Sequence, residues 1–353
     1  MSEDQIIRDT IRAFREKEVE ALWERIDRPE RERYEQLWAG LSDVGVQLLG
    51  LPEAEGGLEV SAEALFEVFS ELGAGSPALA LGALLHVCGV ALVREAVGGE
   101  LQGELADAAA KERFALPGSP LERAPRTGFT LRSNGARLLG GEQRVAQPFA
   151  DWLVIPAREG DAVKLAVVVA DAEGLSFAPQ PSLHGLKLLP FGTLRADAVQ
   201  VEHVFELPDS GRVQQRADGL MAAVLAGMMR EMAARASAYA IERYQGGKMI
   251  HEHDTIRLLI APIQLAARAG RALAIDTLRD RTRAGDGGAS AFLIEHARQA
   301  GLDSVQSFGG YGYMEDYRVE RYLRDANTLE TFFIHASATT RRIAATSFAE
   351  LQR

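Results

Sequence analysis

The glycine- and aromatic-rich stretch Gln306–Tyr313 is the part of the sequence best suited to bind a ligand. It combines the amide side chain of Gln306 with three glycines and two tyrosines, and charged residues follow it at Glu320-Arg321. Glycine lets the main chain approach a ligand closely and present its N–H groups. The pattern favours a cradle for an anionic or nucleotide-bearing cofactor, with a tight interhelical loop bordered by surface ion pairs as the structural alternative.

Other motifs for common chemistries are absent. No GxGxxG follows a strand-like run, and neither GxxxxGK[ST] nor GxSxG occurs, which excludes the usual phosphate-binding loops and the serine hydrolase elbow. The cluster His251–Asp254 is not HExxH, and residues two apart on a helix do not share a face, so we predict no metal site. Isolated histidines favour structural or surface roles; they are His86, His184, His203 and His296.

The composition is typical of a globular protein that binds neither nucleic acid nor membranes. The chain has 353 residues, 47% of them hydrophobic and 25% charged, with a formal net charge of −11. This length allows a sizeable core and two or three domains. An acidic balance argues against nucleic acid or an anionic membrane as partner, since both need a basic surface.

The cysteine content and the N-terminus indicate a cytoplasmic protein. Cys88 is the only cysteine, which excludes an internal disulfide and is typical of a reducing compartment. The N-terminal sequence MSEDQIIRDT carries acidic residues where an export signal needs a basic region. The apolar run Leu79–Val93 is too short to span a membrane.

Helical periodicity dominates both ends of the chain. In the first hundred residues, apolar residues recur at helical spacing over 2–26, 29–44, 61–72 and 76–97. The same spacing returns later over 213–244, 255–283, 289–308 and 327–351. The lengths of these last four blocks suit a four-helix bundle.

The region between Pro117 and Pro208 has a composition and a residue pattern that are typical of a β domain. Proline and glycine become frequent, and the runs at 151–157 and 163–171 resemble buried strands. The pair Asn134-Gly135 lies between two strand-like runs and predicts a hairpin. No helical pattern separates the strands, so we expect an antiparallel sheet.

These patterns predict an α+β fold that is mostly α. We expect an all-helical domain at 1–112, a central β domain at 113–210 and a helical bundle domain at 211–353. The glycine-rich stretch then joins two helices of the last domain.

Three regions resemble the acyl-CoA dehydrogenase family of flavoproteins. The sequence VQSFGGYGYMEDYRVERYLRDA at 305–326 closely resembles the family's C-terminal signature. Residues 45–73 resemble its N-terminal helical segment, and 242–261 resemble its flavin-binding segment R-x-x-F-G-K. The resemblance covers nearly the whole chain and implies an acyl-CoA dehydrogenase-like fold: an N-terminal helical domain, a central antiparallel β domain and a C-terminal four-helix bundle.

The resemblance also implies an activity and its components. In this family a carboxylate removes the α-proton of an acyl-CoA thioester, and the β-hydrogen passes as hydride to FAD. The implied partners are an acyl-CoA substrate, an electron-transfer flavoprotein or similar acceptor, and the related subunits of a homo- or heterotetramer. The implied cofactor-binding residues are Arg243, Gln306, Gly309 and Gly310.

The family's catalytic base is missing from its usual places. Many members carry E-G-T shortly after R-D-A, where this sequence has the stretch Phe332–Ala338, with Ile334 or His335 at the place of the glutamate. Other members carry the base on the first long helix of the last domain, at a position that falls on Ala217, next to Asp218. The candidate bases are therefore Asp218 and His335. For Asp218, the structural alternative is a solvated residue near a helix start.

The flavin-binding residues are only partly present. Gly246 replaces the usual phenylalanine and Asp254 replaces a glutamine, which removes an aromatic face and adds a negative charge near the phosphates. In contrast, Gln306, Gly309 and Gly310, which in the family reach the FAD held mainly by the neighbouring subunit, are intact.

This asymmetry resembles the α2β2 members of the family that act on steroid side chains and other bulky acyl-CoAs. In these heterotetramers one subunit keeps the base and the other lacks it. We predict such a base-lacking partner subunit. The alternatives are a self-sufficient homotetrameric dehydrogenase that uses Asp218 or His335, and a flavin monooxygenase-like or catalytically silent relative.

Overall fold

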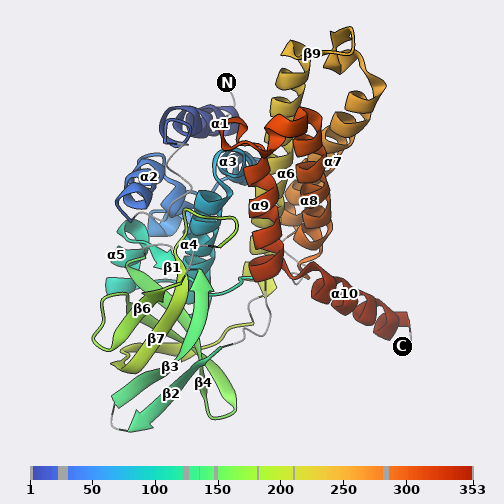
Figure 1. Ribbon diagram of the computed structural model, residues 1–353. Helices are drawn as coiled ribbons and strands as arrows, with labels where there is room; N and C mark the ends of the chain where they lie inside the picture. The colour runs from blue at the N-terminus through green and yellow to red at the C-terminus, as the bar shows by residue number, and fades with distance from the viewer. Residues whose placement is uncertain are drawn as a thin grey trace.

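The computed structural model confirms the predicted order of helices, sheet and helices (Figure 1). The described residues are 3–22, 31–121, 127–134, 136–146, 150–180, 183–209, 211–280 and 286–351. In Figure 1 the sheet lies below the N-terminal helices, and the C-terminal helices stand beside them.

Helices make up the N-terminal part. They are α1 (Glu3–Phe14), a π-helical turn (Arg15–Val19), α2 (Arg31–Asp43), α3 (Ala62–Gly75), α4 (Pro77–Ala96) and α5 (Glu104–Lys111). The sequence pattern does not predict α5. Ser76 both ends α3 and caps α4, since its hydroxyl accepts from the N–H of Leu79 and Pro77 occupies the first helical position. This junction fixes the almost fully buried α4 at the centre of the protein.

The sheet is mixed rather than purely antiparallel. Its strands are β1 (Phe114–Ala115), β2 (Phe129–Asn134), β3 (Ala136–Ala146), β4 (Trp152–Glu159), β5 (Ala162–Val169), β6 (Leu175–Pro179), β7 (Phe191–Gln200) and β8 (His203–Glu206). The strand order is β6-β7-β3-β2-β4-β5-β8, with β1 beside β4. Most neighbours are antiparallel, as predicted, but β1 and β2 run parallel to β4. After the β2–β3 hairpin the chain returns to the other side of β2, so β4 follows the direction of β2.

The predicted hairpin is present, with Asn134 of β2 opposite Ala136 of β3. Gly135 itself lies outside the described residues.

Long helices form the C-terminal part. Its elements are α6 (Gly211–Glu242), the small strands β9 (Tyr244–Gln245) and β10 (Lys248–Met249), α7 (Asp254–Arg279), α8 (Gly288–Phe308), α9 (Glu320–Leu329) and α10 (Ala336–Leu351). The helices α6, α7 and α8 pack against one another, and α3 packs against α6. The most buried helix of the bundle is therefore α6, which contacts helices from both ends of the chain.

The predicted single helix over 327–351 is instead broken in two. A π-helical turn at Glu330–Ile334 follows α9, and His335 then adopts a left-handed conformation with φ +48°. The turn buries both Phe333 and Ile334, and the left-handed residue redirects the chain, so that α10 points away from the other helices (Figure 1).

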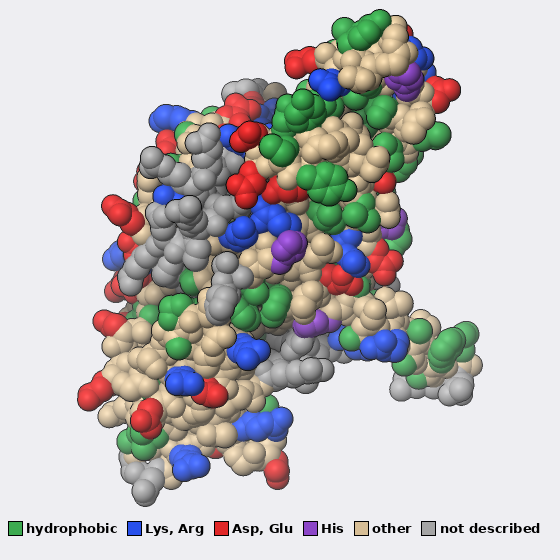
Figure 2. Space-filling model, viewed as in Figure 1, with side chains coloured by type: hydrophobic (Ala, Val, Ile, Leu, Met, Phe, Trp, Pro, Cys, Tyr) green, Lys and Arg blue, Asp and Glu red, His purple; other side chains and the backbone are tan. Residues whose placement is uncertain are grey.

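Among the residues that the structure describes, two helices are long and apolar enough to cross a membrane by length and composition alone. In α4, 89% of the apolar window is buried inside the protein, which identifies α4 as a core helix, whereas in α7 the value is 28%. Leu258 and Leu265 of α7 are 74% and 62% exposed. Figure 2 shows hydrophobic side chains gathered over the C-terminal helices on the face viewed.

A buried carboxylate joins the N-terminal helices to the bundle. The side chain of Glu71, on α3, is fully buried and accepts hydrogen bonds from Arg12 of α1 at 3.0 Å and Arg230 of α6 at 2.9 Å. Arg15 lies 3.4 Å away. Burial alone would raise the pKa of Glu71, but Arg230, Arg15 and Arg12 outweigh burial and hold the pKa below its ordinary value. Glu71 is therefore a charged residue inside the core.

A buried histidine joins α4 to the sheet. Nδ1 of His86 accepts from the N–H of Phe114 at 3.0 Å, and Nε2 lies 3.0 Å from the carbonyl oxygen of Gln47. Because a backbone N–H can only donate, the ring proton is on Nε2, which donates to Gln47, and the ring is neutral. Burial lowers the pKa of His86 to about 4.

We predict that the free energy of unfolding falls as the pH falls from 6.5 to 4. Unfolded His86 takes up a proton in this window and folded His86 does not, so up to about 3 kcal/mol is lost by pH 4. Denaturant titrations at several pH values measure the slope. The variant His86→Gln should flatten it, whereas His184→Gln, at an exposed position, should leave it unchanged; an unchanged slope in both variants would contradict the prediction.

Candidate functional site

A cleft of about 250 Å³ lies between the sheet and the C-terminal helices. The segment after β1, the strands β2 to β4, the first turn of α6 and the π-helical turn line it. Its polar lining side chains are Ser119, Gln143, Arg144, Thr331 and His335. No carboxylate is among the described residues that line the cleft.

The structure brings His335 to this cleft but keeps Ile334 out of it. The His335 side chain is exposed at the cleft wall next to Phe332, whose ring packs edge-on against Phe191 at 5.0 Å. Ile334 is 2% exposed and belongs to the hydrophobic core. π-Helical turns are rare and frequently mark functional sites, and this one determines which side chain faces the cleft.

The structure does not bring Asp218 to the cleft. Asp218 lies on α6 and is 2% exposed, so the alternative of a solvated residue is wrong. Its carboxylate accepts from the N–H of Ala289 at 3.1 Å and from the N–H and hydroxyl of Ser290 at 2.8 and 2.5 Å. Burial raises the pKa of Asp218, although these hydrogen bonds oppose the shift. The carboxylate therefore caps the N-terminus of α8.

A second cavity, of about 490 Å³, brings the four predicted cofactor-binding residues together. Arg243 follows the end of α6, and Gln306, Gly309 and Gly310 lie at the end of α8. We call these four residues with Tyr311 the glycine shelf. The guanidinium carbon of Arg243 lies 5.2 Å from the centre of the Tyr311 ring, a distance typical of a cation–π contact.

The main chain of the glycine shelf is open to a ligand. A side-chain carbon added at Gly309 or Gly310 would meet no atom within 4 Å, and Gly309 has φ +59°. Gly312 has a different role, since a carbon there would lie 2.3 Å from the carbonyl oxygen of Val305. The first two glycines therefore leave space for a ligand, and the third allows close packing.

The glycine shelf fits a dinucleotide that contains a diphosphate. Arg243 supplies a guanidinium group for phosphate oxygens, and Gly309 and Gly310 leave the backbone accessible. Aromatic faces are close by, since Tyr239 stacks on Phe308 at 4.3 Å. Tyr239 was not predicted as a site residue. Its position four residues before Arg243 places both side chains on the same face of the helix, so helical spacing could have indicated it.

The cleft and the glycine shelf lie at opposite ends of α6. Val213 at its start lines the cleft, and Arg243 just beyond its end lines the shelf. At 1.5 Å per residue these positions are about 45 Å apart along the helix. This is farther than an extended dinucleotide reaches, so one cofactor cannot occupy both parts of the same chain.

Two family models match the chain. The model of the acyl-CoA dehydrogenase N-terminal domain matches residues 1–106, and the model of the acyl-CoA dehydrogenase C-terminal domain matches residues 216–343. Together they cover well over half of the chain, including the glycine shelf and the π-helical turn.

Individual proteins show the same likeness along the whole chain. The benzylmalonyl-CoA dehydrogenase of Aromatoleum aromaticum is 25% identical over 364 aligned residues, which cover 92% of each chain. The solved steroid ACAD Tcur3481-Tcur3483 has a TM-score of 0.81 at 20% identity, covering 99% of each chain. An acyl-CoA dehydrogenase of Bacillus anthracis, solved in complex with FAD, has a TM-score of 0.80 at 20% identity, covering 94% of this chain and 65% of that one.

Substitution of Gly312 and of Gly310 by alanine should have different effects on the free energy of unfolding. We predict that Gly312→Ala lowers the free energy of unfolding by about 1 to 3 kcal/mol, because the new methyl group clashes with the backbone at Val305. Gly310→Ala, the matched control, should change it by less than about 0.5 kcal/mol. Equal effects in a denaturant titration would show that the two glycines do not differ in packing.

Proposed function

This chain belongs to the acyl-CoA dehydrogenase family of oxidoreductases, and we propose that it is a partner subunit that completes the FAD site of a related, base-bearing chain. The proposed reaction is the α,β-dehydrogenation of an acyl-CoA thioester: a base takes the α-proton and the β-hydrogen leaves as hydride. FAD, when bound, supplies the two-electron acceptor. The single observation that carries the proposal is a glycine shelf in a chain whose cleft has no carboxylate among its described lining residues.

The absence of a carboxylate among the described residues that line the cleft supports the proposal. Glycine favours the left-handed conformation that His335 adopts, so His335 corresponds to the glycine of the E-G-T pattern and Ile334 to the glutamate. Ile334 is an apolar core residue, and Asp218 is bound to the N-terminus of α8. Neither of these residues can remove a proton from a substrate in the cleft.

The distance between the cleft and the glycine shelf supports a shared cofactor site. Because one FAD cannot reach both ends of α6, the shelf is available to an FAD that lies in the cleft of another chain. Arg243 would pair with its diphosphate, and Gly309 and Gly310 would present their backbone to it. The chain would therefore contribute binding to a site whose chemistry its neighbour performs.

Exposed apolar side chains next to the glycine shelf support a partner chain. They are Ile241, Tyr244, Leu258, Leu265, Tyr313 and Met314, which are 52% to 74% exposed. Figure 2 shows hydrophobic side chains gathered over the C-terminal helices on the face viewed, and exposed apolar patches mark interaction sites. We propose that a related acyl-CoA dehydrogenase subunit covers it in a heterotetramer.

The substrate and the electron acceptor are part of the same proposal. We propose a bulky or cyclic acyl-CoA, since a benzylmalonyl-CoA dehydrogenase matches along the whole chain, with steroid side chains as one candidate class. An electron-transfer flavoprotein or similar acceptor would reoxidise the cofactor. We also propose a cytoplasmic location, because the sequence has a single cysteine, Cys88, which is buried.

A self-sufficient homotetramer is the second candidate function. The observation that favours it is the exposed His335 side chain on the cleft wall. A neutral imidazole there would act as the base in place of a carboxylate.

We predict that the chain purified alone is colourless, and that it becomes part of a yellow heterotetramer when it is co-expressed with its nearest encoded homologue. The reason is that the glycine shelf lies too far from the cleft of its own chain for one FAD to use both, so the proposed site needs a second chain. The visible absorption spectrum and the native mass measure both properties. A yellow homotetramer that an acyl-CoA bleaches would overturn the partner-subunit proposal.

Two substitutions in the co-purified complex should separate the two functions. Arg243→Gln should lower the flavin content at least tenfold, because a charge-assisted contact to phosphate is lost, whereas Arg257→Gln, at an exposed position on α7, should not. His335→Ala should change the rate of flavin reduction by less than twofold. A hundredfold loss with His335→Ala would identify His335 as the base and favour the self-sufficient enzyme.

A further inference from the structure

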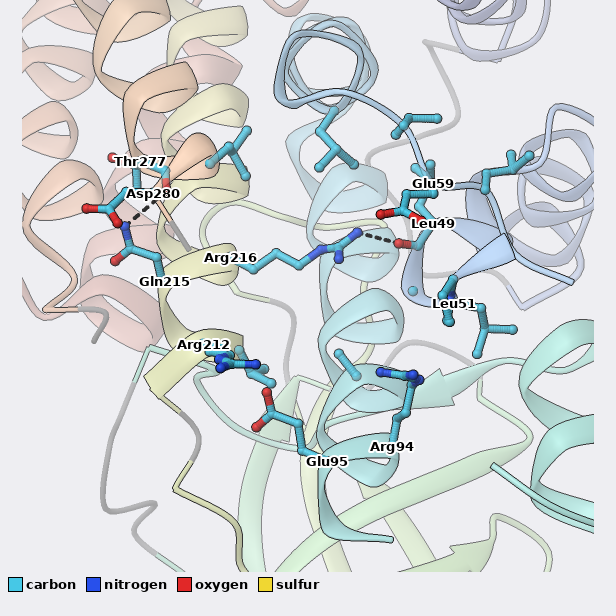
Figure 3. Close-up of a pocket in the computed structure, with 18 residues that line it drawn as sticks. Leu49, Leu51, Glu59, Arg94, Glu95, Arg212, Gln215, Arg216, Thr277 and Asp280 are labelled. Atoms are coloured by element: carbon cyan, nitrogen blue, oxygen red, sulfur yellow. Dashed lines mark hydrogen bonds between the residues drawn. The ribbon is translucent and has the colours of Figure 1, made fainter. Parts of the chain in front are cut away.

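A third cavity, of about 510 Å³, lies on the other side of the α4–α6 contact from the cleft (Figure 3). Ala91 and Arg94 of α4 line this cavity, whereas Leu92 between them lines the cleft. The loop at 49–60, the first turn of α6 and the last turn of α7 complete its wall. The volume is in the range of small-molecule sites.

One side of this cavity is apolar. The side chains that form it are Leu49, Leu51, Leu58, Val60 and Leu65 from the N-terminal part, with Leu278 from α7. This surface can cover an aliphatic or alicyclic group of a ligand and remove it from water.

Three arginines converge on the same space. Figure 3 shows the head groups of Arg94 and Arg212 facing one another across the cavity, with Arg216 between α6 and the loop. Arg216 donates to the carbonyl oxygen of Leu49. The other two arginines come from different helices, α4 and α6, so their positions are set by the packing of the core and not by a single loop.

Most donors of Arg94 and Arg212 have no protein partner. Arg94 donates from Nε to Glu55 at 2.6 Å, and its two terminal nitrogens form no hydrogen bond with the described residues. Arg212 makes no hydrogen bond and no ion pair within 4 Å with the residues that the structure describes. Guanidinium groups bind carboxylates through pairs of parallel N–H donors, and these donors are available.

Three carboxylates, Glu59, Glu95 and Asp280, also line the cavity. In Figure 3, Glu59 and Asp280 lie on opposite flanks of the cavity. Glu95 lies beside Arg212, and its half-buried position raises its pKa, although Arg212 and Arg94 oppose the shift. A raised pKa reduces the negative charge that an incoming anion would meet.

We propose that this cavity binds an amphipathic carboxylate, with the carboxylate group between Arg212 and Arg94 and the apolar body on the leucine-lined side. The site is separate from the cleft and does not depend on the function proposed above. A free carboxylic acid of medium chain length has the required charge and size.

Calorimetric titration of the full chain with octanoate and with octanamide tests the proposal. One octanoate should bind per chain, and octanamide should bind at least tenfold more weakly because it has no charge. The double variant Arg94→Gln/Arg212→Gln should weaken octanoate binding at least tenfold. Arg144→Gln, which changes an arginine of the cleft, should leave it within twofold.

A second variant keeps the test valid if the arginine variants fold poorly. Leu58 is 40% exposed and lines the cavity, so Leu58→Trp should fill the cavity without removing a charge, and octanoate binding should be lost. The proposal is overturned by absent or non-saturable octanoate binding, by equal affinities for octanoate and octanamide, or by a loss of binding in Arg144→Gln instead.

Discussion

The buried charge of Glu71 is the constraint on which the arrangement of the helices depends. A carboxylate without exposure to water is tolerated only where cations compensate it. Here the cations are Arg12 of α1, Arg15 of the π-helical turn that follows α1, and Arg230 of α6. Arg15 also pairs with Glu231 of α6 at 3.1 Å. The N-terminal helices can therefore pack on the bundle in one register only, and this register brings the end of α4 against the start of α6. Both the cleft and the arginine-lined cavity lie at that contact.

The length of α6 explains how the site residues are divided. The helix has 32 residues and is buried along most of its length, so it acts as a rigid spacer between the cleft at its start and the glycine shelf beyond its end. No movement of side chains shortens this distance. A cofactor that uses both kinds of surface must therefore lie between two chains, and the apolar face of α7 beside the glycine shelf is the surface on which they could meet.

Local patterns in the sequence predicted most of the elements, and long-range packing accounts for the differences. The helical periodicity predicted α3, α4, α6, α7 and α8, and the pair Asn134-Gly135 predicted the β2–β3 hairpin. The break at His335 was not predicted, because the apolar residues Phe333 and Ile334 are compatible with an α-helix as well as with a π-helical turn. Likewise, the order of strands that makes β4 parallel to β2 is set by the sheet as a whole. That four shelf residues lie together could be expected because they belong to segments that resemble those of the family, whereas Arg94 and Arg212 meet only in the folded chain.

Because the cleft and the glycine shelf lie at opposite ends of α6, a chain can lack a base in the cleft and still keep the glycine shelf. A substitution at the cleft, such as an apolar residue at 334, alters core packing and proton transfer at one end of α6 and leaves Arg243 and Gly310 about 45 Å away undisturbed. Effects on stability and binding are close to additive at such separations. Loss of proton transfer at the cleft therefore imposes no cost on binding at the shelf. In the proposed complex with a chain that supplies the base, the shelf residues would keep a binding function that does not depend on the cleft residues.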